Sequence, residues 1–185
     1  MKSPSLRINR SQAGLLVLDL QEKLLPSMSE PPRVIQNAVR LLKGAEVLQL
    51  PVFATEQYRK GLGPTVPEIA RIIPGFQPFE KIAFSACGAD GLDAAFQAKG
   101  LADVILCGIE THVCVCHTCL DLLAQDLRVF VVADASASRT EANHRFGLDR
   151  MRDAGAAIVS TEMILFELLR EAGTPDFKRI LTLLK

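Results

Sequence analysis

Short apolar runs alternate with helical patterns along almost the whole chain, and this alternation limits the possible folds more than any other feature. Runs that are apolar on both faces are typical of central parallel strands, and strands that alternate with helices predict a parallel sheet covered on both faces. We therefore expect an α/β fold, a Rossmann-like three-layer α-β-α sandwich with a six-stranded parallel sheet. The runs lie at residues 13–18, 51–54, 79–84, 104–106, 129–133 and 156–159.

The segments between the runs have helical spacing and helix-end signals. Pro31 and Pro32 open the first helix, and Thr174-Pro175 opens the last. The prolines and glycines of residues 56–78 predict a loop with little regular structure. At 185 residues the chain fits one domain, residues 1–185, with a core at 13–170 and a C-terminal helix at 174–185. The sequence leaves open whether that helix packs on the domain or on a second subunit.

A doubly wound sheet in the order 3-2-1-4-5-6 makes the first and fourth strands neighbours and opens a crevice at their carboxyl ends. Asp19 ends the first strand, and the turn Gly108 to Cys114 follows the fourth. Lys81 lies at or near the third strand and can reach the same crevice. Topology alone therefore brings Asp19 and Lys81 towards Cys114. Asp134 closes the fifth strand in this interpretation, as a structural hydrogen-bonding residue.

Charge and composition restrict the possible partners. Lys+Arg and Asp+Glu number 21 each, so no net field favours nucleic acid or an anionic membrane. No stretch resembles a signal peptide or a membrane span, and five cysteines are an odd number for a disulfide framework. The turn after Asp19 has no glycine to hold a dinucleotide phosphate. We expect a cytoplasmic protein that acts on a small molecule, with reduced thiols, and that binds neither nucleic acid nor membrane.

Four motifs follow one another along the chain: Asp19-Leu20-Gln21, Glu80-Lys81 before Phe84-Ser85, Gly108-Ile109-Glu110-Thr111-His112-Val113-Cys114-Val115, and Asp134-Ala135 with Ser138-Arg139. In this order they resemble the isochorismatase-like cysteine hydrolases, a superfamily that includes nicotinamidases and N-carbamoylsarcosine amidase. The resemblance covers residues 14–169. A fifth segment, Thr55-Glu56-Gln57 followed by Gly61-Leu62-Gly63, is similar to the branch called isochorismatase domain-containing proteins.

The resemblance implies a catalytic triad of Asp19, Lys81 and Cys114 and a cis peptide between Ile109 and Glu110. It also implies an oxyanion hole made by the backbone N–H groups of Glu110 and Cys114, and a homo-oligomer, a dimer or a tetramer. Nicotinamidases bind a metal through histidines after the second strand, and residues 50–80 contain none, so we expect no metal and no cofactor. Classical isochorismatases lack the cysteine, which argues against hydrolysis of a vinyl ether.

The expected chemistry is hydrolysis of a small amide-type C–N bond through a thioester on Cys114. A free cysteine titrates at about pH 8.5, and a helix start together with a nearby Lys81 is expected to lower that pKa. Asp19 accepts the proton and later activates water. The predicted substrate contacts, on weaker grounds, are Gln21, Gln57, Tyr58, Phe84 and His112.

Other interpretations of the cysteine-rich turn stay open. A buried cysteine is usually an inert small hydrophobe, and Cys87, Cys107, Cys116 and Cys119 fit that description. Zinc would need ligands that converge, whereas the candidate ligands crowd one helix: His112, Cys114, Cys116, His117 and Cys119. The chain could instead be a non-catalytic protein that keeps the fold for ligand binding or assembly, or a thiol redox sensor.

Overall fold

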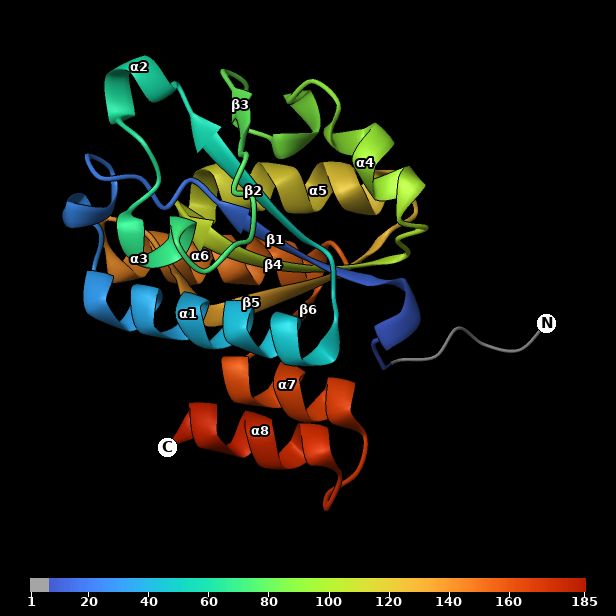
Figure 1. The fold of residues 1–185 in the computed structure, drawn as a ribbon. Helices are drawn as coiled ribbons and strands as arrows, with labels where there is room; N and C mark the ends of the chain where they lie inside the picture. The colour runs from blue at the N-terminus through green and yellow to red at the C-terminus, as the bar shows by residue number, and fades with distance from the viewer. Residues whose placement is uncertain (1–6) are drawn as a thin grey trace.

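Six parallel strands form one sheet in the computed structural model, which describes residues 7–185. The strand order is β3-β2-β1-β4-β5-β6, which confirms the predicted doubly wound topology (Figure 1). Leu18, at the end of β1, pairs with Thr55 of β2 on one side and with Gly108 of β4 on the other. The strands are β1 (Ala13–Leu18), β2 (Val52–Gln57), β3 (Phe79–Lys81), β4 (Asp103–Ile109), β5 (Arg128–Ala137) and β6 (Ala157–Val159).

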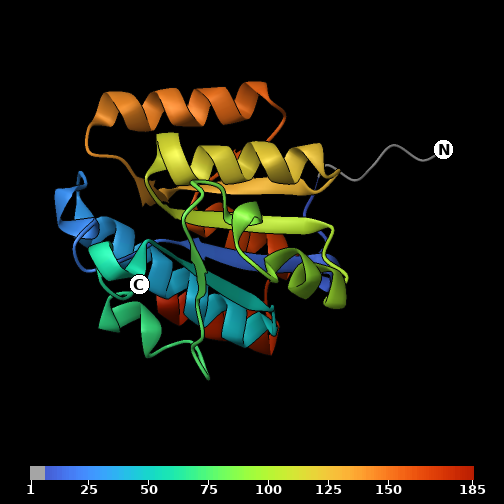
Figure 2. The same cartoon turned by 90° about the horizontal axis from the view of Figure 1, so that it is seen from above.

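Helices cover both faces of the sheet. α1, α7 and α8 lie below it in Figure 1, and Figure 2 shows α5 and α6 side by side across the other face, where α4 also packs. Short turns are η1 (Arg10–Gln12), η2 (Leu25–Ser27), η3 (Ala86–Gly88) and a π-helical turn η4 (Thr111–Val115). The helices are α1 (Pro31–Leu48), α2 (Arg59–Leu62), α3 (Pro67–Ala70), α4 (Leu92–Ala98), α5 (Cys116–Ala124), α6 (Glu141–Asp153), α7 (Thr161–Leu169) and α8 (Pro175–Leu184).

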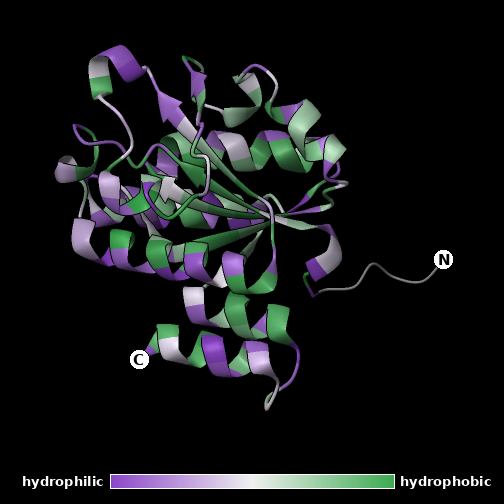
Figure 3. Ribbon diagram, in the orientation of Figure 1, coloured by the Kyte–Doolittle hydropathy of each residue, from purple (hydrophilic) through white to green (hydrophobic). Residues whose placement is uncertain are grey.

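The alternation of side chains along β1 divides the core into two layers. Leu15 and Val17 pack with the α1 and α7 side, and Leu16 and Leu18 pack with the α5 side. All six residues of β1 are buried, as expected for a central parallel strand. Figure 3 shows hydrophobic colouring along the central strands and hydrophilic colouring at the end of β2. Burial of each large aliphatic side chain contributes about 1.5–3 kcal/mol, so this sheet is the rigid frame for its carboxyl edge.

The strand ends differ from those expected from apolar runs. β2 and β4 extend to Gln57 and Ile109, and β5 continues past Asp134, with a register shift against β4. Polar residues remain in these strands because their side chains find partners in the fold. The strand expected over residues 79–84 stops at Lys81, and residues 56–78 contain two one-turn helices, α2 and α3.

Polar side chains cap three of the helices, and the last helix packs on its own domain. The side chains of Thr140, Ser160 and Thr174 cap α6, α7 and α8. α8 packs on α1 and α7 of its own chain, with Ile180 fully buried. Within residues 7–185 no helix is long and apolar enough to cross a membrane.

Candidate active site

A buried ion pair forms the centre of the candidate site. Asp19 follows β1 and Lys81 ends β3, and the Lys81 Nζ atom lies 2.7 Å from Asp19 Oδ2. Both side chains are fully buried. They meet across the end of β2, the one strand between β1 and β3 in the sheet. A buried charge that lacks its partner is costly, so each residue holds the other in place.

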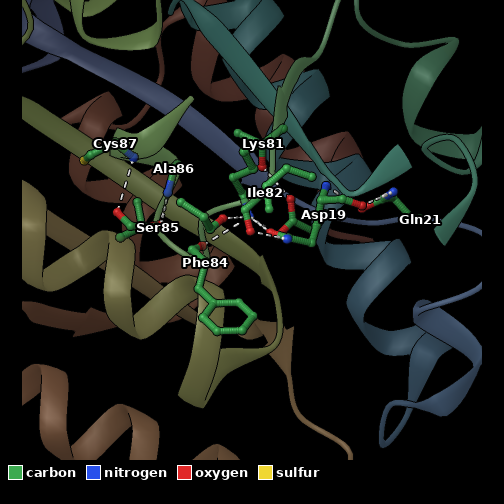
Figure 4. A network of polar contacts seen from close by, with 12 residues as sticks. Asp19, Gln21, Lys81, Ile82, Phe84, Ser85, Ala86 and Cys87 are labelled. Carbon is green, nitrogen blue, oxygen red and sulfur yellow. Dashed lines mark hydrogen bonds and ion pairs between the residues drawn. The ribbon is translucent and has the colours of Figure 1, made fainter. Parts of the chain in front are cut away.

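Four acceptors surround the ammonium group of Lys81. Besides Asp19, Nζ donates to Gln57 Oε1 at 2.7 Å and to the carbonyl oxygens of Phe84 at 3.1 Å and Ala83 at 3.4 Å. In Figure 4 the Phe84 ring points away from Lys81 while its backbone faces the ammonium. Three N–H donors thus share four acceptors, which fixes Lys81 with its charge intact.

Asp19 is held by its backbone and by a residue that sequence reasoning missed. Its φ of +55° lies in the left-handed region, which non-glycine residues adopt mainly where the structure requires it. Thr55 Oγ1 donates to Asp19 Oδ1 at 2.7 Å. The sequence offered one sign of this contact: Thr55 is polar and lies at the end of the second strand, which the predicted strand order places beside the first. The two oxygens of Asp19 therefore have separate partners, Thr55 and Lys81.

Close backbone approaches place the turn that carries Cys114. A Cβ at Gly108, whose φ is +121°, would lie 2.1 Å from the Leu18 carbonyl oxygen. A Cβ at Gly147 on α6 would lie 2.9 Å from the Cα of His112. Glycine at these two positions lets β4 approach the end of β1 and lets α6 pack on η4. Cys114 lies in the π-helical turn before α5, in the neighbourhood predicted from the topology.

The charge state of Cys114 differs from the expectation. Burial, and after it the negative charge of Asp19, raise the pKa of the thiol to about 12, although the charge of Lys81 acts to lower it. The predicted lowering of the pKa is wrong for this structure, because the lysine charge is already balanced by Asp19 in a buried site. Cys114 is therefore a neutral thiol at rest, close enough to the ion pair for both of its charges to act on the thiol pKa.

Side chains from the end of β5 and from α6 secure the turn on its other side. The Ile109–Glu110 peptide is cis. The Glu110 carboxylate accepts from the backbone N–H of Arg139 at 3.2 Å and from its Nε at 3.0 Å. His112 Nδ1 lies 2.9 Å from Ser138 Oγ. Within η4, Thr111 Oγ1 lies 2.8 Å from the buried His144 Nδ1.

Two of the predicted substrate contacts have structural partners instead. Gln21 is fully buried, and its amide bonds to the backbone of Gln57 and to the Gly63 carbonyl. Gln57 is half-buried and binds Lys81 through Oε1, while its Nε2 donates to the Ile82 carbonyl at 2.7 Å. Both side chains therefore support the ion pair. His112 is half-buried and lies within the turn itself, in η4.

Tyr58 and Phe84 lie at the surface beside Lys81. The Tyr58 N–H donates to the Lys81 carbonyl, and its ring is 52% exposed. Phe84 is 55% exposed and contacts the ring of His117 edge-on, with centroids 5.9 Å apart. Tyr58 also lines a cavity of about 480 Å³ beside β3, of which Lys60 and Ile82 form other walls. Both aromatic side chains are thus close to the strand that carries Lys81.

The other polar candidates have structural environments. Asp134 Oδ1 accepts from the N–H and the hydroxyl of Thr161 at 2.8 Å each, at the start of α7. Burial raises the pKa of Cys119 to about 12, and it also raises the pKa of Cys116, which does not favour easy oxidation of this pair. Among the described residues, 7–185, no three His, Cys, Asp or Glu side chains are arranged to hold a metal ion.

Comparison with known proteins places these features in context. Residues 13–163 match the family described as the isochorismatase domain. Mouse isochorismatase domain-containing protein 2A is 42% identical over 97% of this chain and 85% of its own length. A Caenorhabditis elegans structure named MAR1 ribonuclease is 39% identical, with a TM-score of 0.89, over 96% of this chain and 91% of that one.

Two bacterial YcaC structures are also similar. The Escherichia coli protein, described as an octameric hydrolase of unknown specificity, is 29% identical, with a TM-score of 0.91, over 98% of this chain and 91% of that one. The Pseudomonas aeruginosa protein, described with hexane-2,5-diol and covalent acrylamide, is 28% identical. Its TM-score is 0.90, over 98% of this chain and 93% of that one.

Proposed function

This chain belongs to the isochorismatase domain family, and from that membership we propose that it is a cysteine hydrolase that cleaves the C–N bond of a small amide-type compound. One observation carries the proposal. The buried Asp19–Lys81 ion pair, 2.7 Å long, acts on the Cys114 thiol from two elements that are distant in the sequence. A base, a fixed cation and a thiol close to one another are the groups that nucleophilic catalysis by cysteine requires.

The first half-reaction acylates the enzyme. As Cys114 Sγ bonds to the amide carbon, its proton passes to Asp19, and the carbonyl oxygen becomes an oxyanion. The C–N bond then breaks, and the amine leaves with the proton from Asp19. Lys81 keeps its proton throughout, so its charge stabilises the thiolate that develops during attack. This route suits a thiol whose pKa is about 12, because the thiol loses its proton only when it attacks.

The second half-reaction consumes water. Asp19 takes a proton from water, the resulting hydroxide attacks the thioester, and the C–S bond breaks. The proton returns to sulfur, and a carboxylic acid is released. In both halves the backbone N–H groups of Glu110 and Cys114 donate to the oxyanion in this proposal. Loss of one such donor typically lowers a rate by about 100- to 1000-fold.

The relatives support hydrolysis and covalent chemistry. One YcaC protein is described as a hydrolase, and another is described with covalent acrylamide, which is itself a small amide. We propose by extension that His112, Tyr58 and Phe84 contact the substrate beside the triad. We also propose a homo-oligomer, because the E. coli relative is described as octameric and because Ile82 and Phe84 expose apolar surface beside β3.

Trapping the thioester tests the proposal. The wild type, Asp19→Asn and Cys114→Ser proteins are incubated with a panel of small amides and analysed by intact-protein mass spectrometry. We expect an acyl adduct on Cys114 in the wild type when turnover is stopped with acid. None should form in Cys114→Ser, which lacks the nucleophile, or in Asp19→Asn, because Asp19 is the base of both half-reactions. Cys87→Ser is the matched control and should behave as the wild type does. Amide hydrolysis that survives Cys114→Ser would refute the mechanism.

RNA is the alternative substrate class, raised by the name of the C. elegans structure. The chain has 21 basic and 21 acidic residues and hence no net charge to attract a phosphate backbone. Single-stranded RNA is therefore added to the same panel. RNA fragments that depend on Cys114 would replace the amide proposal. A protein that hydrolyses nothing in the panel yet binds a panel member would favour the non-catalytic alternative.

A further inference from the structure

Gln57 lies between the ammonium group of Lys81 and the chain that follows β3. We infer that Gln57 is a positioning residue for Lys81, which it holds against Asp19 and Cys114 without adding a charge. The inference rests on the proposed function, and it replaces the predicted substrate contact at this position. It is carried by hydrogen bonds at both ends of the Gln57 side chain and by a clamp on its backbone.

The orientation of the Gln57 amide follows from its two partners. Oε1 lies 2.7 Å from Lys81 Nζ, and Nε2 lies 2.7 Å from the Ile82 carbonyl oxygen. An ammonium group only donates and a carbonyl only accepts, so the amide cannot be reversed. Its oxygen therefore faces Lys81, and its nitrogen is tied to the residue directly after the lysine.

The Gln57 backbone is fixed by the side chain of Gln21. Gln21 Oε1 accepts from the Gln57 N–H at 2.8 Å, and its Nε2 donates to the Gln57 carbonyl at 3.0 Å and to the Gly63 carbonyl at 2.6 Å. This buried amide pairs with Gln57 in both directions, as a neighbouring strand would. The chain of contacts therefore runs from Gln21 through Gln57 to Lys81.

The Gln57 side chain is uncharged, and this preserves the charge balance of the ion pair. Asp19 and Lys81 together carry no net charge, and Gln57 offers Lys81 an acceptor that preserves this balance. A carboxylate at the same place would put a second negative charge 2.7 Å from Nζ and would oppose formation of a thiolate at Cys114. A leucine would remove one of the four acceptors around the Lys81 ammonium and with it the hydrogen bond that holds the ammonium from the side of β2.

Alkylation of Cys114 by iodoacetamide, followed in the full chain by peptide mass spectrometry, measures the effect. Removal of a hydrogen bond to a charged group alters a rate by on the order of tenfold, so Gln57→Leu should slow Cys114 alkylation by about that factor. In a Lys81→Met background, Gln57→Leu should have no further effect, because the pathway through Lys81 is already lost. Gln97→Leu, at an exposed position on α4, is the matched control.

The double-mutant cycle separates positioning from a general structural role. Equal slowing by Gln57→Leu in both backgrounds, or no slowing in either, would overturn the inference. If Gln57→Leu does not fold, Gln57→Glu keeps the size and the acceptor and should slow alkylation at every pH through its charge. An unchanged rate in Gln57→Glu would also overturn the inference. If neither Asp19→Asn nor Lys81→Met changes the rate of Cys114 alkylation, the proposed function fails. If those two variants change the rate and the Gln57 variants do not, the inference alone fails.

Discussion

Lys81 Nζ lies 2.7 Å from Asp19 Oδ2, and neither side chain is exposed to solvent. The two charges act on the same thiol with opposite sign: Asp19 raises the pKa of Cys114, and Lys81 lowers it. Each member of the pair is required for the proposed hydrolysis. Removal of Asp19 should nevertheless lower the pKa of the resting thiol, and removal of Lys81 should raise it. These opposite shifts distinguish the site from one in which either residue acts alone.

Asp19→Asn should accelerate alkylation of Cys114 by iodoacetamide at pH 7–8, and Lys81→Met should slow it, by about tenfold per unit of pKa change. Both variants should lose amide hydrolysis. The measurement is the alkylation rate of each cysteine peptide by mass spectrometry. Cys87 is the internal control, because its pKa is raised by burial and then affected by Ser85 and Asp93 rather than by the ion pair. A change of the same sign in both variants would contradict this electrostatic account.

The wild-type protein should show no plateau of Cys114 alkylation near neutral pH. Its thiol pKa is raised to about 12, so the thiolate fraction grows about tenfold per pH unit through the range 7–10. Rates measured at half-unit intervals test this directly. A plateau below pH 8 would mean that the thiol is ionised at rest.

Gly108→Ala should destabilise the fold strongly. A Cβ would lie 2.1 Å from the Leu18 carbonyl oxygen at a φ of +121°, so β4 and β1 would have to separate, at a cost of about 3 kcal/mol or more. Gly100→Ala is the control: its φ is +62°, but no atom lies within 4 Å of its Cβ position, and we expect a loss of about 1 kcal/mol. Urea denaturation measures both. Equal losses would contradict the close approach.

Asp134→Ala should lower the free energy of unfolding by about 1–2 kcal/mol, because the N–H and hydroxyl of Thr161 lose their acceptor at the start of α7. Asp134→Asn retains an oxygen acceptor and should restore most of that loss. Thermal denaturation gives the stabilities. The alkylation rate of Cys114 should be unchanged in both variants, and a large change would give Asp134 a role in the site.

The fold should lose stability on acidification through His144. Burial lowers the pKa of His144 from its ordinary value of 6.5, so the unfolded chain binds more protons than the folded one as the pH falls. The loss begins near the unfolded pKa and is complete below the lowered folded pKa. His144→Gln keeps a group that can bond Thr111 and should reduce the drop in melting temperature between pH 7.5 and pH 5. An identical drop in the variant would exclude His144 as the cause.

Topology made much of the candidate site predictable. Asp19 and Cys114 were placed at neighbouring strand ends by the predicted order, and the structure has that order. Thr55 and Gln21 were harder to interpret, because a polar residue near a strand end can face a ligand or a partner in the fold. Their partners, Asp19 and Gln57, are 36 residues away in each case, beyond any local pattern.

The sequence by itself determined the sheet, its order and the clustering of candidate groups at its carboxyl edge, because apolar periodicity and strand alternation are properties of the chain. Only the tertiary structure decided the charge state of Cys114 and the roles of Gln21 and Gln57. Burial and the negative charge of Asp19 raise the pKa of the thiol to about 12 against the opposing effect of Lys81, where the residue types alone suggested a lowered value. Dehydration and hydrogen bonding depend on which atoms meet, and that is settled only when distant segments pack together.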